Sequence, residues 1–114
     1  MKKIETKHGV LYLERVKTKR NCYRLLDSEQ RILWFDDTKK EALKQATLIE
    51  NCNELGEWLH NFDDVCWGTK EEVKGYAKGY AKDNGHRFDK AWFEANYNRI
   101  GDTYILFEYS EAHL

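Results

Sequence analysis

Proline is absent from this chain of 114 residues, and so are low-complexity runs and stretches with the composition of a linker. With no signal for a domain boundary, we expect one domain spanning residues 1–114. Hydrophobic residues make up 41% of the chain and charged residues 34%. That balance is typical of a folded globular domain and not of a disordered chain.

Cysteine is scarce, and long apolar runs are missing. Cys22, Cys52 and Cys66 are odd in number and widely spaced, which fits neither a disulfide framework nor a zinc site. We expect them to be reduced and packed as small apolar side chains. Residues 1–5 lead into no apolar stretch, so neither a signal peptide nor a membrane span is expected. The sequence therefore predicts a cytoplasmic protein.

The motifs of catalysis and cofactor binding are missing too. There is no phosphate-binding glycine loop, dinucleotide fingerprint or nucleophile elbow. The best candidate cluster is His60 with Asp63 and Asp64, where an imidazole and two carboxylates are able to hold a divalent ion. An exposed acidic turn explains the same residues. We predict a protein that is not an enzyme and needs no cofactor or metal, with a nuclease at His60 and Asp63 as a third possibility.

Three strands are predicted in the first part of the chain. Residues 10–16, 22–26 and 31–35 are rich in β-branched, aromatic and aliphatic residues, and short polar turns at 17–21 and 27–30 separate them. Parallel neighbours would need long crossover connections, so these short turns favour an antiparallel meander.

A long helix is predicted next. Thr38 and Glu41 have the spacing of a capping box, in which each side chain accepts the other residue's backbone N–H. Apolar residues then recur at spacings of three and four, which marks one buried helix face. Gly56 is a possible break in this helix. The predicted face consists of Ala42, Ala46, Ile49, Cys52, Leu55, Leu59 and Phe62.

Two more helices and one strand complete the prediction. Thr69 and Glu72 form a second capping box, and Asn84-Gly85 is a suitable helix end. The buried face of this helix is expected to hold Val73, Tyr76, Ala77, Tyr80 and Ala81. A third helix begins at Asp89, with Phe88, Ala91, Trp92 and Ala95 turned inward. A strand at 104–109 is expected to join the first sheet. The fold class is α+β, in the order βββ-α-α-α-β.

The second helix contains an unusual repeat. Residues 74–82 repeat Lys-Gly-Tyr-Ala with a period of four, which places Lys74, Lys78 and Lys82 on one ridge beside Gly75 and Gly79. Each glycine costs about 1 kcal/mol relative to alanine inside a helix. We infer a flat strip that another backbone approaches, either within this protein, from a partner protein, or from a nucleic-acid strand.

Charge is distributed unevenly along the chain. Residues 1–50 carry 12 basic and 8 acidic side chains, a net of +4, whereas residues 51–114 carry 7 and 12, a net of −5. Within residues 50–72 the only base is Lys70. Glu50, Glu54 and Glu57 are spaced to share one helix face. This segment is either a solvated surface or a docking face for a basic groove. Its carboxylates are Glu50, Glu54, Glu57, Asp63, Asp64, Glu71 and Glu72.

The amino-terminal part is basic and carries a family resemblance. Residues 23–29 followed by 34–42 resemble the strand-to-capped-helix junction of the three-strand-plus-helix domain found in AP2-like proteins and at the front of phage-type tyrosine recombinases. The resemblance covers residues 9–60 and implies a sheet that lies in the DNA major groove. Leucines occupy much of the sheet that would read the bases, and no recombinase catalytic domain follows. The candidate DNA-binding residues are Lys17, Lys19, Arg20, Arg24 and Arg31.

A second resemblance is one of type. A small chain with an acidic patch and no catalytic motif is similar to phage-encoded accessory proteins, including anti-CRISPR inhibitors that block DNA-binding nucleases. That resemblance implies a phage or mobile-element protein that binds and inhibits a host protein, and this is the leading hypothesis. A DNA-binding module that uses the basic sheet is the alternative. Trp58, Trp67 and Trp92 are expected either to complete the core or to form a homodimer interface.

Overall fold

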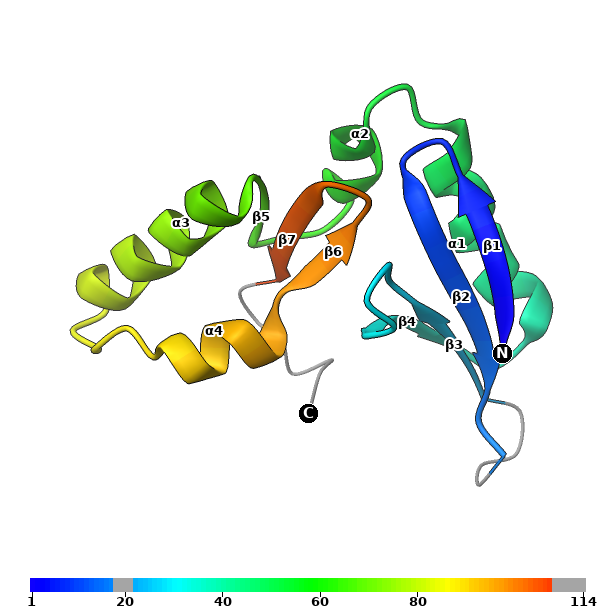
Figure 1. Ribbon diagram of the computed structural model, residues 1–114, viewed down its shortest axis with the longest axis horizontal. Helices are drawn as coiled ribbons and strands as arrows, with labels where there is room; N and C mark the ends of the chain where they lie inside the picture. Colours follow the sequence, from blue (N-terminus) through cyan, green and yellow to red (C-terminus); the bar gives the residue numbers. More distant parts are fainter. Residues whose placement is uncertain (18–21, 108–114) are drawn as a thin grey trace.

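Two antiparallel sheets and four helices make up the fold, an α+β arrangement as predicted (Figure 1). The computed structural model describes residues 1–17 and 22–107. The first sheet has the strand order β1-β2-β3-β4, and the second has the order β5-β7-β6. The strands are β1 (Lys2–Thr6), β2 (Gly9–Arg15), β3 (Tyr23–Leu26), β4 (Ile32–Asp36), β5 (Val65–Gly68), β6 (Asn98–Ile100) and β7 (Thr103–Phe107). The helices are α1 (Lys39–Asn51), α2 (Leu55–Leu59), α3 (Lys70–Asp83) and α4 (Lys90–Asn96).

The first sheet is a meander of four strands, one more than predicted. β1 pairs antiparallel with β2, and Lys3 lies opposite Tyr12. The segment Lys2–Thr6 contains one strongly apolar residue, Ile4, and charged side chains on either side of it. Charged side chains are typical of an edge strand, because they discourage pairing with a further chain. This composition hides the strand from a search for apolar alternation.

The last strand was placed in the wrong sheet. β7 pairs with β5 on one side and with β6 on the other, and these three strands form a separate sheet. β6 and β7 form a hairpin through Gly101, whose φ of 56° is in the left-handed region that glycine adopts readily. β5 and β6 have only 4 and 3 residues. Strands so short carry almost no periodic signal, and neither was predicted.

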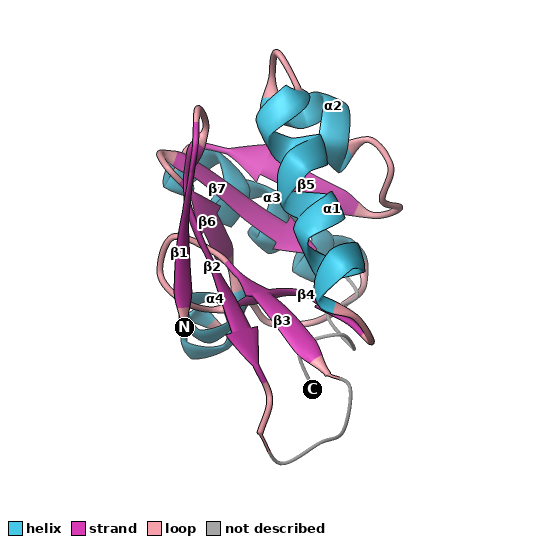
Figure 2. Ribbon diagram, turned by 90° about the vertical axis from the view of Figure 1, so that its right-hand side faces the viewer, coloured by secondary structure: helices cyan, strands magenta, loops and turns pink. Residues whose placement is uncertain are grey.

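Helix α1 begins as expected, since the Thr38 hydroxyl accepts the N–H of Glu41 at 3.1 Å. Figure 2 shows α1 lying along one face of the first sheet. Its predicted apolar face is confirmed, with Ala42, Ala46 and Ile49 buried. The break in the long helix lies at residues 52–54, and Gly56 is inside α2. A Cβ at Gly56 would lie 3.1 Å from the indole of Trp67, so a larger residue there would require the ring to shift slightly.

Helix α3 has the predicted capping box, with Thr69 and Glu72 exchanging hydrogen bonds of 3.2 Å. Its buried face is narrower than predicted. Val73 is buried and Ala77 half-buried, but 57% of Tyr76 and 38% of Tyr80 is exposed. The expectation that Gly75 and Gly79 meet another part of this protein is wrong for the described residues. Apart from the local backbone of α3, no described atom would lie within 4 Å of a Cβ at either position.

Helix α4 begins at its predicted cap, because the Asp89 carboxylate accepts the N–H of Trp92 at 3.1 Å. Of the predicted inward residues, Phe88 is half-buried and packs against Phe93, as expected. The prediction is wrong for Ala91, Trp92 and Ala95, which are exposed, whereas Phe93 and Tyr97 are buried. Phe93 packs with Val73 of α3 and Leu106 of β7 in a small second core. The larger core lies between the two sheets and α1 and α2, and it includes Trp58, which is 2% exposed.

The two sheets are joined through a buried aspartate. Asp27, in the turn between β3 and β4, is fully buried. Its Oδ1 accepts the N–H groups of Glu29 and Arg31 at 2.8 and 2.9 Å within the turn. Its Oδ2 accepts the side-chain amide of Asn98 at 2.8 Å and the N–H of Arg99 at 3.0 Å, both in β6. One carboxylate therefore shapes a turn of the first sheet and fixes it to a strand of the second.

A second contact between the sheets brings two hairpin turns together. Gly9, at the start of β2, and Gly101, between β6 and β7, have their backbones in direct contact. A Cβ at either residue would overlap the other hairpin, and both φ angles are positive. The Ser28 hydroxyl adds to this junction by accepting the N–H of Gly101 at 2.9 Å and donating to the carbonyl of Val10 at 2.8 Å.

We expect Asp27→Ala to lower the free energy of unfolding by about 3–5 kcal/mol, because it removes the acceptor of three partly buried backbone N–H groups and one of the two acceptors of the Asn98 amide. Urea unfolding followed by circular dichroism measures the loss. Asp37→Ala, which removes an exposed carboxylate, is the matched control and should change stability by no more than about 0.5 kcal/mol. Equal small losses in both variants would show that the network does not join the sheets.

Candidate functional site

The acidic segment is exposed throughout. All seven predicted carboxylates lie at the surface, and none has an ion-pair partner among residues 1–17 and 22–107. The ion pairs of this part of the chain use other acids, namely Glu5, Glu14, Glu29 and Glu94. We call the seven residues the acidic surface: Glu50, Glu54, Glu57, Asp63, Asp64, Glu71 and Glu72.

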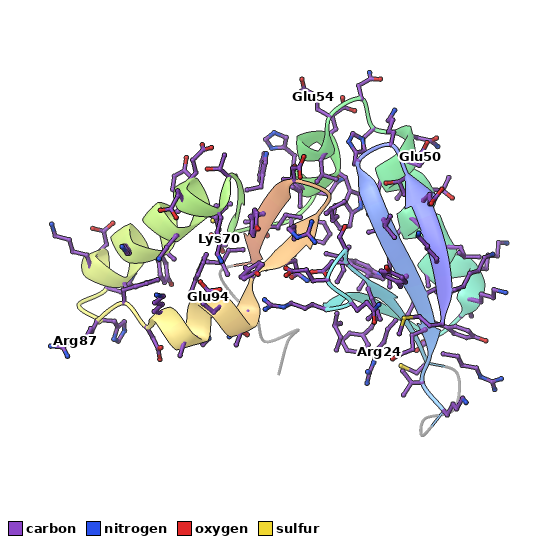
Figure 3. The ribbon with its side chains drawn as sticks, viewed as in Figure 1. Arg24, Glu50, Glu54, Lys70, Arg87 and Glu94 are labelled. Atoms are coloured by element: carbon purple, nitrogen blue, oxygen red, sulfur yellow. The ribbon has the colours of Figure 1, made fainter. Side chains whose placement is uncertain are left out.

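The predicted row of three glutamates on one helix face is not present. The chain leaves α1 after Asn51 and enters α2 at Leu55, so Glu50 belongs to one helix and Glu57 to the other. Figure 3 shows Glu50 and Glu54 toward the same end of the molecule on separate elements. The break separates charges that would repel one another on a continuous helix.

Six members of the acidic surface flank the short strand β5. Asp63 and Asp64 directly precede it, and Glu71 and Glu72 lie in the first turn of α3, just after it. Glu54 caps α2 and Glu57 lies within it, and this helix packs against the indole of Trp67 in β5. Three segments that adjoin β5 thus each supply two of these carboxylates.

Some of these carboxylates also have local structural roles. Glu50 accepts the N–H of Lys7 at 2.6 Å and so holds the β1–β2 turn against the end of α1. Glu57 accepts the N–H of Glu54 at 3.4 Å, and Glu72 caps α3. Negative charge at a helix start is favourable because it opposes the positive end of the helix dipole. Their charge remains uncompensated by any side-chain base in the described residues.

A groove of about 300 Å³ lies within the acidic surface, beside Trp67. Glu54 and Glu57 line it on one side, together with His60, whose ring meets the indole edge-on at 5.1 Å between centroids. An indole ring next to two carboxylates is able to receive a cationic side chain, because the ring face and the charges both attract it. Sequence reasoning had treated Trp67 only as a surplus aromatic residue.

Of the predicted basic residues of the first sheet, the structure describes Lys17, Arg24 and Arg31, and two of these three have intramolecular partners. Lys17 is exposed, whereas Lys19 and Arg20 lie outside the described residues. Arg24 pairs with Glu14 at 3.3 Å across the β2–β3 ladder. A cleft of about 370 Å³ lies between this part of the sheet and the end of α4. The end of α4 therefore partly covers the side of the sheet opposite to α1.

Arg31 is used inside the protein. Its two terminal nitrogens donate to the carbonyls of Tyr97 and Glu94 at 2.8 and 2.6 Å, and its guanidinium lies 4.2 Å from the centroid of the Tyr97 ring. These carbonyls belong to the last turn of α4 and lack partners within the helix, so a cation is favourable there. Arg31 therefore binds α4 to the turn that contains Asp27.

A polar cluster connects α4 to α3 and to the first sheet. Lys70 pairs with Glu94 at 3.1 Å, and this hydrogen bond raises the pKa of Lys70. The hydroxyl of Tyr97 donates to Glu29 at 3.2 Å. Burial, and then the hydrogen bond to Glu29, raises the pKa of Tyr97. Lys70 and Tyr97 thus stay protonated at neutral pH and hold the helix pair in place.

The histidines do not gather around a catalytic or metal centre in the described residues. His8 bonds through Nε2 to the carbonyl of Cys52 at 2.7 Å, which holds the β1–β2 turn against the end of α1. His113 lies outside the described residues. In residues 1–17 and 22–107, no group of three or more His, Cys, Asp or Glu side chains has the arrangement of a metal site. The cluster predicted from His60, Asp63 and Asp64 is thus not assembled there.

Comparison with known proteins identifies no relative. No protein-family model, no curated protein and no solved structure matches the chain. Among the described residues, no helix has both the length and the apolar character needed to cross a membrane. The function is therefore argued from the geometry of this chain.

We expect Arg31→Ala to lower the free energy of unfolding by about 2–3 kcal/mol, because two charge-assisted hydrogen bonds to buried carbonyls are lost. Arg31→Lys should recover little of that loss, since an ammonium lacks the forked geometry of the guanidinium. Lys17→Ala is the control and should leave the urea midpoint unchanged. If Arg31→Ala is as stable as the unmodified protein, Arg31 has no structural role and is again a candidate DNA-binding residue.

Proposed function

We propose that this protein acts without catalysis, by docking its acidic surface onto a positively charged surface of a partner protein. The observation that carries the proposal is the state of the seven carboxylates. They are exposed, they have no side-chain counter-charge within ion-pair distance in the described residues, and six of them lie in the segments next to β5. Separated fields of this kind steer an oppositely charged partner and accelerate its association.

The groove beside Trp67 supplies an anchor for such a contact. Exposed carboxylates alone contribute little affinity, because water and salt screen them. Binding energy concentrates on aromatic and arginine residues that become desolvated at the centre of an interface. An arginine or lysine of the partner, seated between the Trp67 indole and Glu57, would be shielded from water and would contact both an aromatic ring and a carboxylate.

The partner we propose is a host nuclease that holds nucleic acid in a positively charged channel. The chain would then be a phage or mobile-element inhibitor that works in the cytoplasm, with a nuclease of the CRISPR type as the first target to test. Carboxylates that enter the channel take the place of phosphates, and DNA binding is lost by competition. The DNA-binding alternative is not favoured by any contact of the first sheet, where Arg24 and Arg31 have intramolecular partners.

The test is inhibition of DNA cleavage by a panel of purified, guide-loaded nucleases, with DNA in large excess over this protein. The variant Glu54→Gln/Glu57→Gln/Asp63→Asn/Asp64→Asn removes four charges and keeps oxygen acceptors for the local hydrogen bonds. We expect the concentration for half-inhibition to rise at least tenfold, because both the steering and the charges beside Trp67 are lost.

The matched control is Glu5→Gln/Asp37→Asn/Glu41→Gln/Asp83→Asn, which changes net charge equally at exposed positions away from β5. This control should inhibit as the unmodified protein does. Failure to inhibit any nuclease of the panel would remove the proposed target. Equal loss in both variants would show that net charge matters and the acidic surface does not.

A further inference from the structure

A second candidate surface lies on the helix pair α3 and α4, which projects from the two sheets (Figure 1). A cavity of about 320 Å³ opens between the two helices. Its apolar lining consists of Ala77, Tyr80, Ala81, Phe88, Trp92 and Leu106. An open apolar cavity of this size is large enough for one flat ring and is typical of ligand sites.

The rim of this groove exposes aromatic rings. Trp92 of α4 is 40% exposed and Tyr80 of α3 is 38% exposed, and both line the cavity. Tyr76, one turn before Tyr80, is 57% exposed. These three are half of the exposed large hydrophobic side chains in the described residues. Such a concentration on one pair of helices indicates a surface that meets a partner.

The same helix pair is basic, in contrast to the acidic surface. Residues 74–92 contain five Lys or Arg side chains and two Asp side chains, a net charge of +3. Lys74, Lys78 and Lys82 follow one another at intervals of about 6 Å along α3. Arg87 lines the groove, and Figure 3 shows it at the outer end of the pair, where α3 turns into α4. Asp89, the one acid of the lining, is held by the N–H of Trp92.

The two glycines of the repeat leave the outer side of α3 without projecting side chains at these positions. Apart from the local backbone of α3, no described atom lies within 4 Å of a Cβ placed on Gly75 or Gly79. The helix backbone is therefore open to close approach beside the row of lysines. Neither glycine lines the α3–α4 groove, so the strip adds open space beside the lysines and is not part of the groove itself.

We propose that the α3–α4 groove binds single-stranded nucleic acid, with one base between Tyr80 and Trp92 and the phosphates against Lys78, Lys82 and Arg87. Stacking of bases on exposed aromatic rings beside a basic track is the physical basis of sequence-tolerant single-strand binding. A duplex is disfavoured because its bases are already stacked and cannot enter the groove. This proposal is independent of the acidic surface and does not require the proposed inhibitor function.

The experiment measures the fluorescence anisotropy of a labelled 15-nucleotide oligo-dT on titration with the full chain, at 50 and at 200 mM salt. Trp92→Ala removes one stacking ring without altering charge and should weaken binding by about five- to a hundredfold. Lys78→Gln/Arg87→Gln should lower the slope of log K against log salt by about 1.4, since each phosphate contact to a single strand contributes about 0.7.

The control is Lys39→Gln/Lys40→Gln on α1, which removes two exposed lysines distant from the groove and should leave affinity nearly unchanged. Circular dichroism confirms that each variant folds. Binding that survives Trp92→Ala, or falls equally in the α1 control, would overturn the proposal, as would tighter binding to a matched duplex. If no oligonucleotide binds, and a protein is captured after nuclease treatment in a way that depends on Trp92, the groove binds a protein and the proposal is wrong.

Discussion

The arrangement of this fold depends on one buried carboxylate. Asp27 accepts four hydrogen bonds, two within its own turn and two from β6. The turn it shapes also positions Arg31, which holds the last turn of α4. The two sheets and the α3–α4 pair therefore share a single polar junction. Because a buried charge is tolerated only with its partners in place, the junction admits one relative placement of these parts.

The local elements were largely predictable, whereas their assembly was not. The caps at Thr38, Thr69 and Asp89 are predictable because a side-chain oxygen just before a helical apolar pattern typically accepts an N–H of the first turn. β1, β5 and β6 are not predictable from the sequence because they are short or charged. Their strand structure depends on pairing with neighbouring strands. The sheet that contains β7 was missed because its partners, β5 and β6, were not predicted. Non-local pairing leaves little trace in a single segment.

The candidate sites were predicted in composition and only in part in geometry. The exposed carboxylates follow from the charge of residues 50–72, which no helix face or strand needs to bury. The roles of Trp67 and Arg31 depend on contacts with segments far along the chain, so no local pattern indicates them. The Lys-Gly-Tyr-Ala repeat was recognised as unusual, but the open side of its glycines appears only in three dimensions.

The long separation between the partners of Asp27 has a consequence for synthesis of the chain. Asn98 and Arg99 follow this aspartate by 71 and 72 residues. Until β6 is synthesised, Oδ2 of Asp27 therefore lacks the donors that it has in the folded protein, and water must take their place. Completion of the turn that contains Asp27 awaits the emergence of β6, near the carboxyl end. An amino-terminal fragment is accordingly expected to be less stable than its regular meander suggests. The contacts that join the two sheets form together, late in synthesis, because they link residues far apart in the chain.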